Sequence, residues 1–102
     1  MFLITLKFAH NKAAAKDSMP GHNEWIQQGM SDGVFLVVGS LQPQQGGAIL
    51  AFAEDRADIE ARVAKDPFVK EGVVAADVLE IIPNRADPRL TFLLPTVKQG
   101  TS

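Results

Sequence analysis

One histidine of this sequence stands on a helical face that otherwise looks apolar. In the stretch SMPGHNEWIQQG, residues 18–29, helical spacing places His22 on the same side as Trp25, Ile26 and Gly29. An imidazole that points toward a core must find partners for both ring nitrogens, because an unpaired buried polar group costs on the order of 1–3 kcal/mol. Two interpretations stay open: a structural histidine that donates to a backbone carbonyl, or a titratable group with one nitrogen available for chemistry.

A carboxylate occurs at a break in the chain, in the sequence DPF at 66–68. A residue before proline avoids the α region, so a helix must end here, and Asp66 can cap the short turn that follows. That capping role could be its whole function. A carboxylate close to His22 would instead favour the charged imidazolium and fix its tautomer, leaving the second nitrogen to move a proton. Contact between the two is sterically feasible, but their spacing does not establish it.

Ser40 and Trp25 are candidate contacts for a small-molecule ligand. Ser40 ends an apolar run and could donate to a ligand oxygen or satisfy local backbone. Trp25 could line the site of an aromatic substrate or belong to the core.

Metal and cofactor sites lack their usual patterns. His10, in a polar stretch, could be a solvated loop residue or a third metal-type ligand beside His22 and Asp66, yet no H-x-H or H-x-x-x-H spacing occurs. The glycine pair at 46–47 lies in a predicted hairpin rather than between a strand and a helix, so it does not predict a phosphate loop. We therefore expect no metal and no cofactor.

Composition limits the partners. The chain has 102 residues, 46% hydrophobic and 22% charged, with a net charge of -2 and no cysteine. This predicts one domain, near the size at which a second subunit often helps, without disulfides or thiolate chemistry. The weak charge argues against nucleic acid and anionic lipid as partners, and no run approaches the roughly 20 apolar residues of a membrane span. We expect a cytoplasmic protein.

Hydrophobic periodicity predicts the elements that position these residues. Alternation over 2–8 indicates a strand, and helical spacing indicates a helix from about 18 to 32, capped by Ser18 and ended by Gly33, whereas 11–17 could be a loop or a short turn. The remaining expected elements are a strand at 34–41 covered on both faces, a turn at 42–47, a strand at 48–53, a helix at 55–65 capped by Asp55, and a strand at 73–82. The order β-α-β-β-α-β predicts an α+β, ferredoxin-like domain: a four-stranded antiparallel sheet with two helices on one face.

The C-terminal extension, residues 84–102, follows a polar connector. Its run LTFLL at 90–94 is strand-like and too hydrophobic to remain solvated. We expect it to pair with or pack against a neighbouring subunit, which makes a homodimer or higher homo-oligomer the expected assembly. The end at 98–102 is expected to be frayed.

Several short motifs, taken in order, resemble the YCII-related (YciI-like) family over about residues 1–83. They are the first strand, HNEWI at 22–26, GSL at 39–41, GAIL at 47–50, DPF at 66–68 and GV at 72–73. The resemblance implies a ferredoxin-like fold, dimers of the α+β-barrel type, and a histidine–aspartate pair as the catalytic centre of a pocket, here His22 and Asp66. It also links the chain to muconolactone-isomerase-like and dehydrochlorinase-type enzymes that act on small ring compounds.

Two positions depart from that family. Members often carry an arginine one turn before the histidine, where this chain has Met19, and Gly-Pro-Leu where it has GSL at 39–41. The first departure weakens the expectation of an anionic substrate held by arginine, and the second places the hydroxyl of Ser40 near the pocket. Two function classes remain open: a cofactor-independent enzyme that moves a proton on a small organic substrate, including cyclic ones, by elimination, isomerisation or lactone chemistry, and a non-catalytic dimeric module that binds a small ligand.

Overall fold

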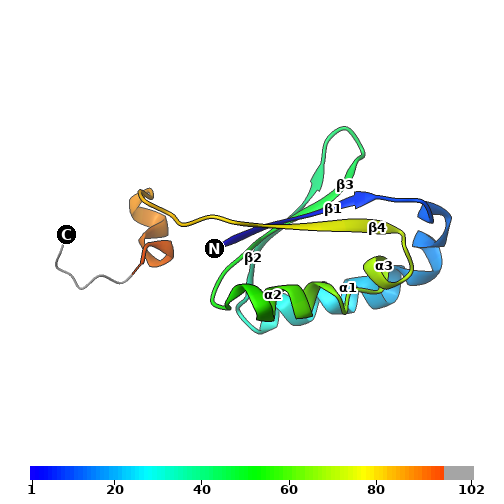
Figure 1. The fold of residues 1–102 in the computed structure, drawn as a ribbon, viewed down its shortest axis with the longest axis horizontal. Coiled ribbons are helices and arrows are strands. Elements are labelled where there is room, and N and C mark those ends of the chain that lie inside the picture. Colours follow the sequence, from blue (N-terminus) through cyan, green and yellow to red (C-terminus); the bar gives the residue numbers. More distant parts are fainter. Residues whose placement is uncertain (96–102) are drawn as a thin grey trace.

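Four antiparallel strands form one sheet in the computed structural model, which describes residues 1–95 (Figure 1). The strands are β1 (Phe2–Phe8), β2 (Phe35–Leu41), β3 (Gly46–Ala51) and β4 (Val74–Glu80). Their order is β2-β3-β1-β4, so the two central strands are β3 and β1 and the two edges are β2 and β4. This arrangement confirms the predicted α+β, ferredoxin-like fold.

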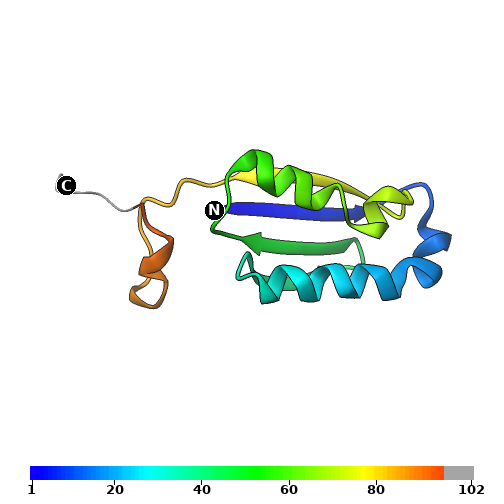
Figure 2. The same ribbon diagram turned by 90° about the horizontal axis from the view of Figure 1, so that it is seen from below.

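All the α-helices lie on one face of the sheet, as the view from below shows (Figure 2). They are α1 (Ala15–Ser31), α2 (Arg56–Val63) and α3 (Pro67–Lys70), and two 3-10 helices, η1 (Lys12–Ala14) and η2 (Pro88–Leu93), complete the elements of residues 1–95. The core fills the space between this face and the helices. Phe2, Ile4 and Leu6, alternate residues of β1, are buried there, because only one face of the strand meets the helices.

The first helix begins earlier than predicted. It starts at Ala15 rather than at Ser18, with Ala14 at the N-cap position, and it continues through Pro20. The physical reason is local: alanines at the start favour helix, and Pro20 removes only one hydrogen bond near the exposed beginning. Its end matches the prediction, because Gly33 adopts φ 76° just after the helix and its N–H bonds the carbonyl of Met30.

Strand β2 is less covered than predicted. Phe35 at its start is buried, but most of its other side chains are exposed, and Val37 retains 59% of its accessible surface. The reason is its place at the edge of the sheet, where one face has no helix over it. Apolar composition alone did not distinguish this strand from one covered on both sides.

The prediction of a strand at 90–94 was wrong for the single chain, because Pro88–Leu93 forms the 3-10 helix η2 there. Asp87 caps this turn by accepting from the N–H of Arg89, and Pro88 at the first position favours the helical φ angle. Phe92 packs edge-on against Phe52, with ring centroids 5.5 Å apart, so the run is held by side-chain packing rather than by a strand neighbour. The frayed end expected at 98–102 lies outside the described residues.

Candidate active site

The structure brings His22 and Asp66 together. The imidazole Nδ1 of His22, in the first half of α1, lies 2.8 Å from Oδ1 of Asp66, in the turn between α2 and α3. His22 is 9% exposed and Asp66 is 0% exposed, so the pair is shielded from solvent. Because a carboxylate only accepts hydrogen bonds, this contact assigns the proton on the neutral ring to Nδ1 and leaves Nε2 as an acceptor.

Asp66 performs both roles that its sequence suggested. Its Oδ1 also accepts from the backbone N–H of Phe68 at 3.0 Å, which caps α3. The second oxygen, Oδ2, is buried and has no hydrogen-bond partner among the described residues. The hydrogen bonds of this carboxylate among the described residues are therefore those from the His22 imidazole and from the Phe68 N–H, and both end on Oδ1.

Aromatic rings hold the imidazole in place. The ring of Phe68 stacks on it with centroids 3.9 Å apart and planes within 3°, and Trp25 stacks at 5.9 Å. Trp25 is itself fixed, because its Nε1–H donates to the carbonyl oxygen of Arg62 at 2.9 Å. These contacts and the bond to Asp66 restrict rotation of the ring and give Nε2 a defined direction.

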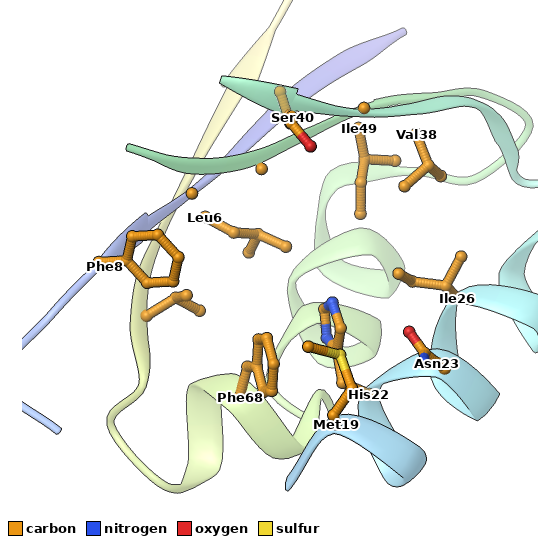
Figure 3. A pocket seen from close by; sticks show the side chains of 15 residues that line it. Leu6, Phe8, Met19, His22, Asn23, Ile26, Val38, Ser40, Ile49 and Phe68 are labelled. Carbon is orange, nitrogen blue, oxygen red and sulfur yellow. The ribbon is translucent and has the colours of Figure 1, made fainter. Parts of the chain in front are cut away.

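A cavity of about 320 Å³ opens beside His22, between α1 and the sheet (Figure 3). This volume falls at the lower end of the range for ligand pockets, roughly 300–1,000 Å³. Most of its wall is apolar; its polar side chains are those of His22, Asn23 and Ser40. No described residue hydrogen-bonds Nε2 of His22, and Figure 3 shows the imidazole rising into the cavity from the helix side while Ser40 points in from the sheet.

The predicted ligand contacts differ in their outcome. Ser40 lines the cavity as expected, whereas Trp25 does not, because its hydrogen bond to Arg62 turns the indole toward α2. Sequence reasoning missed Phe68, which both lines the cavity and stacks on His22. Its place directly behind the Asp-Pro cap was the available signal, because the cap sets where the next side chain points. Asn23, next to His22, carried no separate signal.

A second polar cluster lies at the far end of α1. Arg62 donates to both carboxylate oxygens of Glu54, at 3.1 and 2.8 Å, and to Asp32 at 3.0 Å. The hydrogen bonds from Arg62 and Gln28 lower the pKa of Asp32, and the bonds to Glu54 raise the pKa of Arg62. The charged groups of this cluster pair with one another, which suits a structural role.

Within residues 1–95, no group of three or more His, Cys, Asp or Glu side chains is placed to hold a metal ion. In the same part of the chain, no helix combines the length and apolar character needed to cross a membrane.

The sheet order, the helices on one face and the buried histidine–aspartate pair beside a cavity define a ferredoxin-like α+β domain with a pocket. The chain belongs to the YCII-related family, whose domain profile matches residues 1–83. Residues 84–95 of the described chain, with η2, therefore lie outside the family domain.

A solved structure shares this fold. It is the 5-chloro-2-hydroxyhydroquinone dehydrochlorinase TftG from Burkholderia phenoliruptrix, in complex with 2,5-dihydroxybenzoquinone. The match has a TM-score of 0.63 at 17% sequence identity and covers 79% of this chain and 93% of that one. At this identity the similarity establishes the fold alone. No curated protein matches the chain.

Proposed function

We propose that this protein is a small enzyme in which His22 and Asp66 transfer a proton on a small organic molecule bound in the cavity. The observation that carries the proposal is the 2.8 Å contact between Nδ1 of His22 and Oδ1 of Asp66, with the other ring nitrogen left for the cavity. A base whose tautomer is set by a buried carboxylate and whose free nitrogen faces a pocket is a recurring arrangement for general acid–base catalysis.

The proposed chemistry follows from the direction of the imidazole. Nε2 accepts a proton from a C–H or O–H bond of the substrate, and the imidazolium that forms is stabilised by Asp66 through Nδ1. The same nitrogen then returns the proton to another atom, as in an isomerisation, or to a leaving group, as in an elimination. The hydroxyl of Ser40 and the carboxamide of Asn23 can donate to a substrate oxygen on which negative charge develops.

The substrate class follows from the cavity walls and from the structural neighbour. Phe8, Ile26, Val38 and Phe68 are among the apolar residues of the lining, which suits a ring compound. The neighbour is named a dehydrochlorinase of a ring compound, and a dehydrochlorination removes a proton together with chloride. We propose elimination, isomerisation or lactone chemistry on a small cyclic substrate. We also propose that the protein is cytoplasmic, and cell fractionation with the full chain tests that location.

A substrate panel tests the activity. Wild type, His22→Gln and His10→Gln are assayed against chlorinated ring compounds and lactones; His10 is the matched control because it does not line the cavity. We expect turnover of at least one compound, retained in His10→Gln and lost in His22→Gln. Binding of panel compounds without conversion of any of them by wild type would instead favour a non-catalytic ligand-binding module.

A titration tests the proton-transfer step independently. The imidazole of His22 is followed by NMR in wild type, with His10 as the internal reference. Proton transfer requires the His22 ring to exchange protons with solvent or ligand while the protein is folded. A ring that stays neutral throughout the folded pH range contradicts the proposal.

We also propose that the protein forms a homodimer through the face of the sheet without helices. Val37, Leu50, Leu3 and Leu79 lie in register across all four strands on that face, and Val37 and Leu79 are 59% and 53% exposed. A row of large apolar side chains in water is unfavourable, and a second copy would cover it. Whether residues 90–94 join that contact stays a prediction; Leu90 and Phe92 are exposed.

Sedimentation tests the dimer. At micromolar concentration we expect wild type and Gln27→Lys, a control on the exposed side of α1, to sediment as dimers, and Leu79→Lys as a monomer. A monomeric wild type contradicts the proposal.

A further inference from the structure

A second hollow of about 340 Å³ adjoins the cavity beside His22. Both are lined by Phe8, Ser40 and Gly46, so the two share a wall at the end of β1 and the start of β3. The other residues of the outer hollow are Lys12 on η1 and Leu41, Gln42 and Gln44 on the β2–β3 hairpin. A ligand in the inner cavity therefore has neighbouring space into which a substituent can extend.

The two hollows differ in charge. The inner one has an apolar wall with no lysine, arginine or carboxylate side chain. Lys12 is the one charged side chain that lines the outer hollow, and it makes no ion pair with any carboxylate of residues 1–95. The position that faces the inner cavity one turn before His22 is Met19, which is neutral. A positive charge is thus present at the outer end of the combined space and not at its inner end.

Lys12 is held beside the wall that the two hollows share. Its ammonium lies 4.5 Å from the centre of the Phe8 ring, which itself lines both of them. The backbone just before it is anchored, because the Asn11 side chain donates to the carbonyl oxygen of Glu71 at 2.7 Å. These contacts reduce the conformational freedom that a surface lysine would lose on binding an anion.

We propose that the two hollows form one site that accepts an amphipathic ligand, with its ring in the inner cavity and an anionic substituent, such as a carboxylate, at Lys12. The ammonium supplies the charge, and the carboxamides of Gln42 and Gln44 supply further N–H donors. A ring that carries its carboxylate on a short flexible chain would place the ring beside His22 and the charge beyond Phe8. This inference rests on the proposed function, because it takes the inner cavity to be the ring site.

The test uses a matched pair of ligands, 3-phenylpropionate and 3-phenylpropionamide, which differ in charge and little in shape. Their binding to the full chain is measured by NMR titration in wild type, Lys12→Gln and Lys16→Gln. Lys16→Gln is the control. Lys16 lies four residues after Lys12 and lines neither hollow, so the substitution removes the same charge away from the proposed site. We expect wild type and Lys16→Gln to bind the carboxylate about 2- to 5-fold more tightly than the amide, the range for one exposed ion pair, and this preference to fall at high salt.

The Lys12→Gln variant separates the role of Lys12 from the role of the inner cavity as a ring site. In Lys12→Gln the carboxylate and the amide should bind equally, while the amide keeps its wild-type affinity. Equal binding of the two ligands by wild type, or a preference that survives in Lys12→Gln, overturns the role of Lys12 and leaves the inner cavity as a ring site. If neither ligand binds, the inner cavity is not a ring site and the proposal fails with it.

Discussion

Two polar clusters tie α1 to the helices beside it, and they are built in opposite ways. At one end of α1, Arg62 bridges Glu54 and Asp32 near the surface through three hydrogen bonds. In its first half, His22 meets Asp66 in the protein interior through a single one. In the first cluster each charged group has an oppositely charged partner, with one guanidinium between two carboxylates. The second leaves Oδ2 of Asp66 and Nε2 of His22 without partners among the described residues.

The difference shows how a polar cluster built for stability can be told from one available for chemistry. A fully paired network near the surface contributes to packing and has no group left for a ligand. A buried pair with unused hydrogen-bonding capacity costs stability, and such a cost is common at sites that bind or react. Its position beside a cavity, rather than its residue types alone, is what favours a functional role.

The largest effect should come from His22→Gln. Turnover of a substrate found in the panel should fall by roughly 10²–10⁴-fold, the usual contribution of a general acid–base residue. Arg62→Met, assayed beside it, should leave turnover within a few-fold of wild type. Equal losses in the two variants would remove the distinction between the clusters.

Asp66→Asn should have the next largest effect on turnover. The amide oxygen can still accept from the N–H of Phe68, so the α3 cap survives, but the negative charge that stabilises an imidazolium is lost. We expect turnover to fall about 10- to 100-fold, less than for His22→Gln, with the folded structure retained by circular dichroism. Full activity in Asp66→Asn would mean that His22 acts without its partner.

Arg62→Met should have the largest effect on stability among the variants of the paired cluster. It removes charge-assisted bonds to two carboxylates while keeping the length of the stem, and partial solvent screening limits the loss to about 1–2 kcal/mol in the free energy of unfolding. Arg56→Met is the control, because its ion pairs are more exposed. Urea unfolding measures the free energy of unfolding of both variants. Equal losses of stability would contradict the larger contribution expected of the Arg62 ion pairs.

Asp32→Asn should give the smallest effect, visible in its pH dependence. The pKa of Asp32 is lowered in the folded state by Arg62 and Gln28, so its contribution to stability is present above its ordinary value of 3.8 and is lost as the pH falls through the lowered one. The melting temperature of Asp32→Asn should lie below that of wild type at pH 7, and the gap should close on acidification. A gap that stays constant down to pH 2 would contradict this assignment.

Local features were predictable because they depend on neighbours in the chain. Three such features were expected and are present: the alternation of Phe2, Ile4 and Leu6, the end of α1 at Gly33, and the cap that Asp66 provides for the N–H of Phe68. Local spacing left alternatives open where a long-range partner decided the result. Trp25 lies on the His22 face of the helix as expected and packs against the core, but the carbonyl oxygen of Arg62 sets the direction of its indole, and it does not line the cavity.

By itself, the sequence determined the order of the elements, the helical face of His22 and the capping role of Asp66, because each depends on residues only a few positions apart. The tertiary structure alone decided that Nδ1 of His22 and Oδ1 of Asp66 meet at 2.8 Å across 44 residues, that Phe68 stacks on the ring, and that His22 lines a cavity. It also decided that residues 90–94 lack a strand partner in the single chain. The physical reason is common to these cases: packing of distant segments sets side-chain directions that no local spacing specifies.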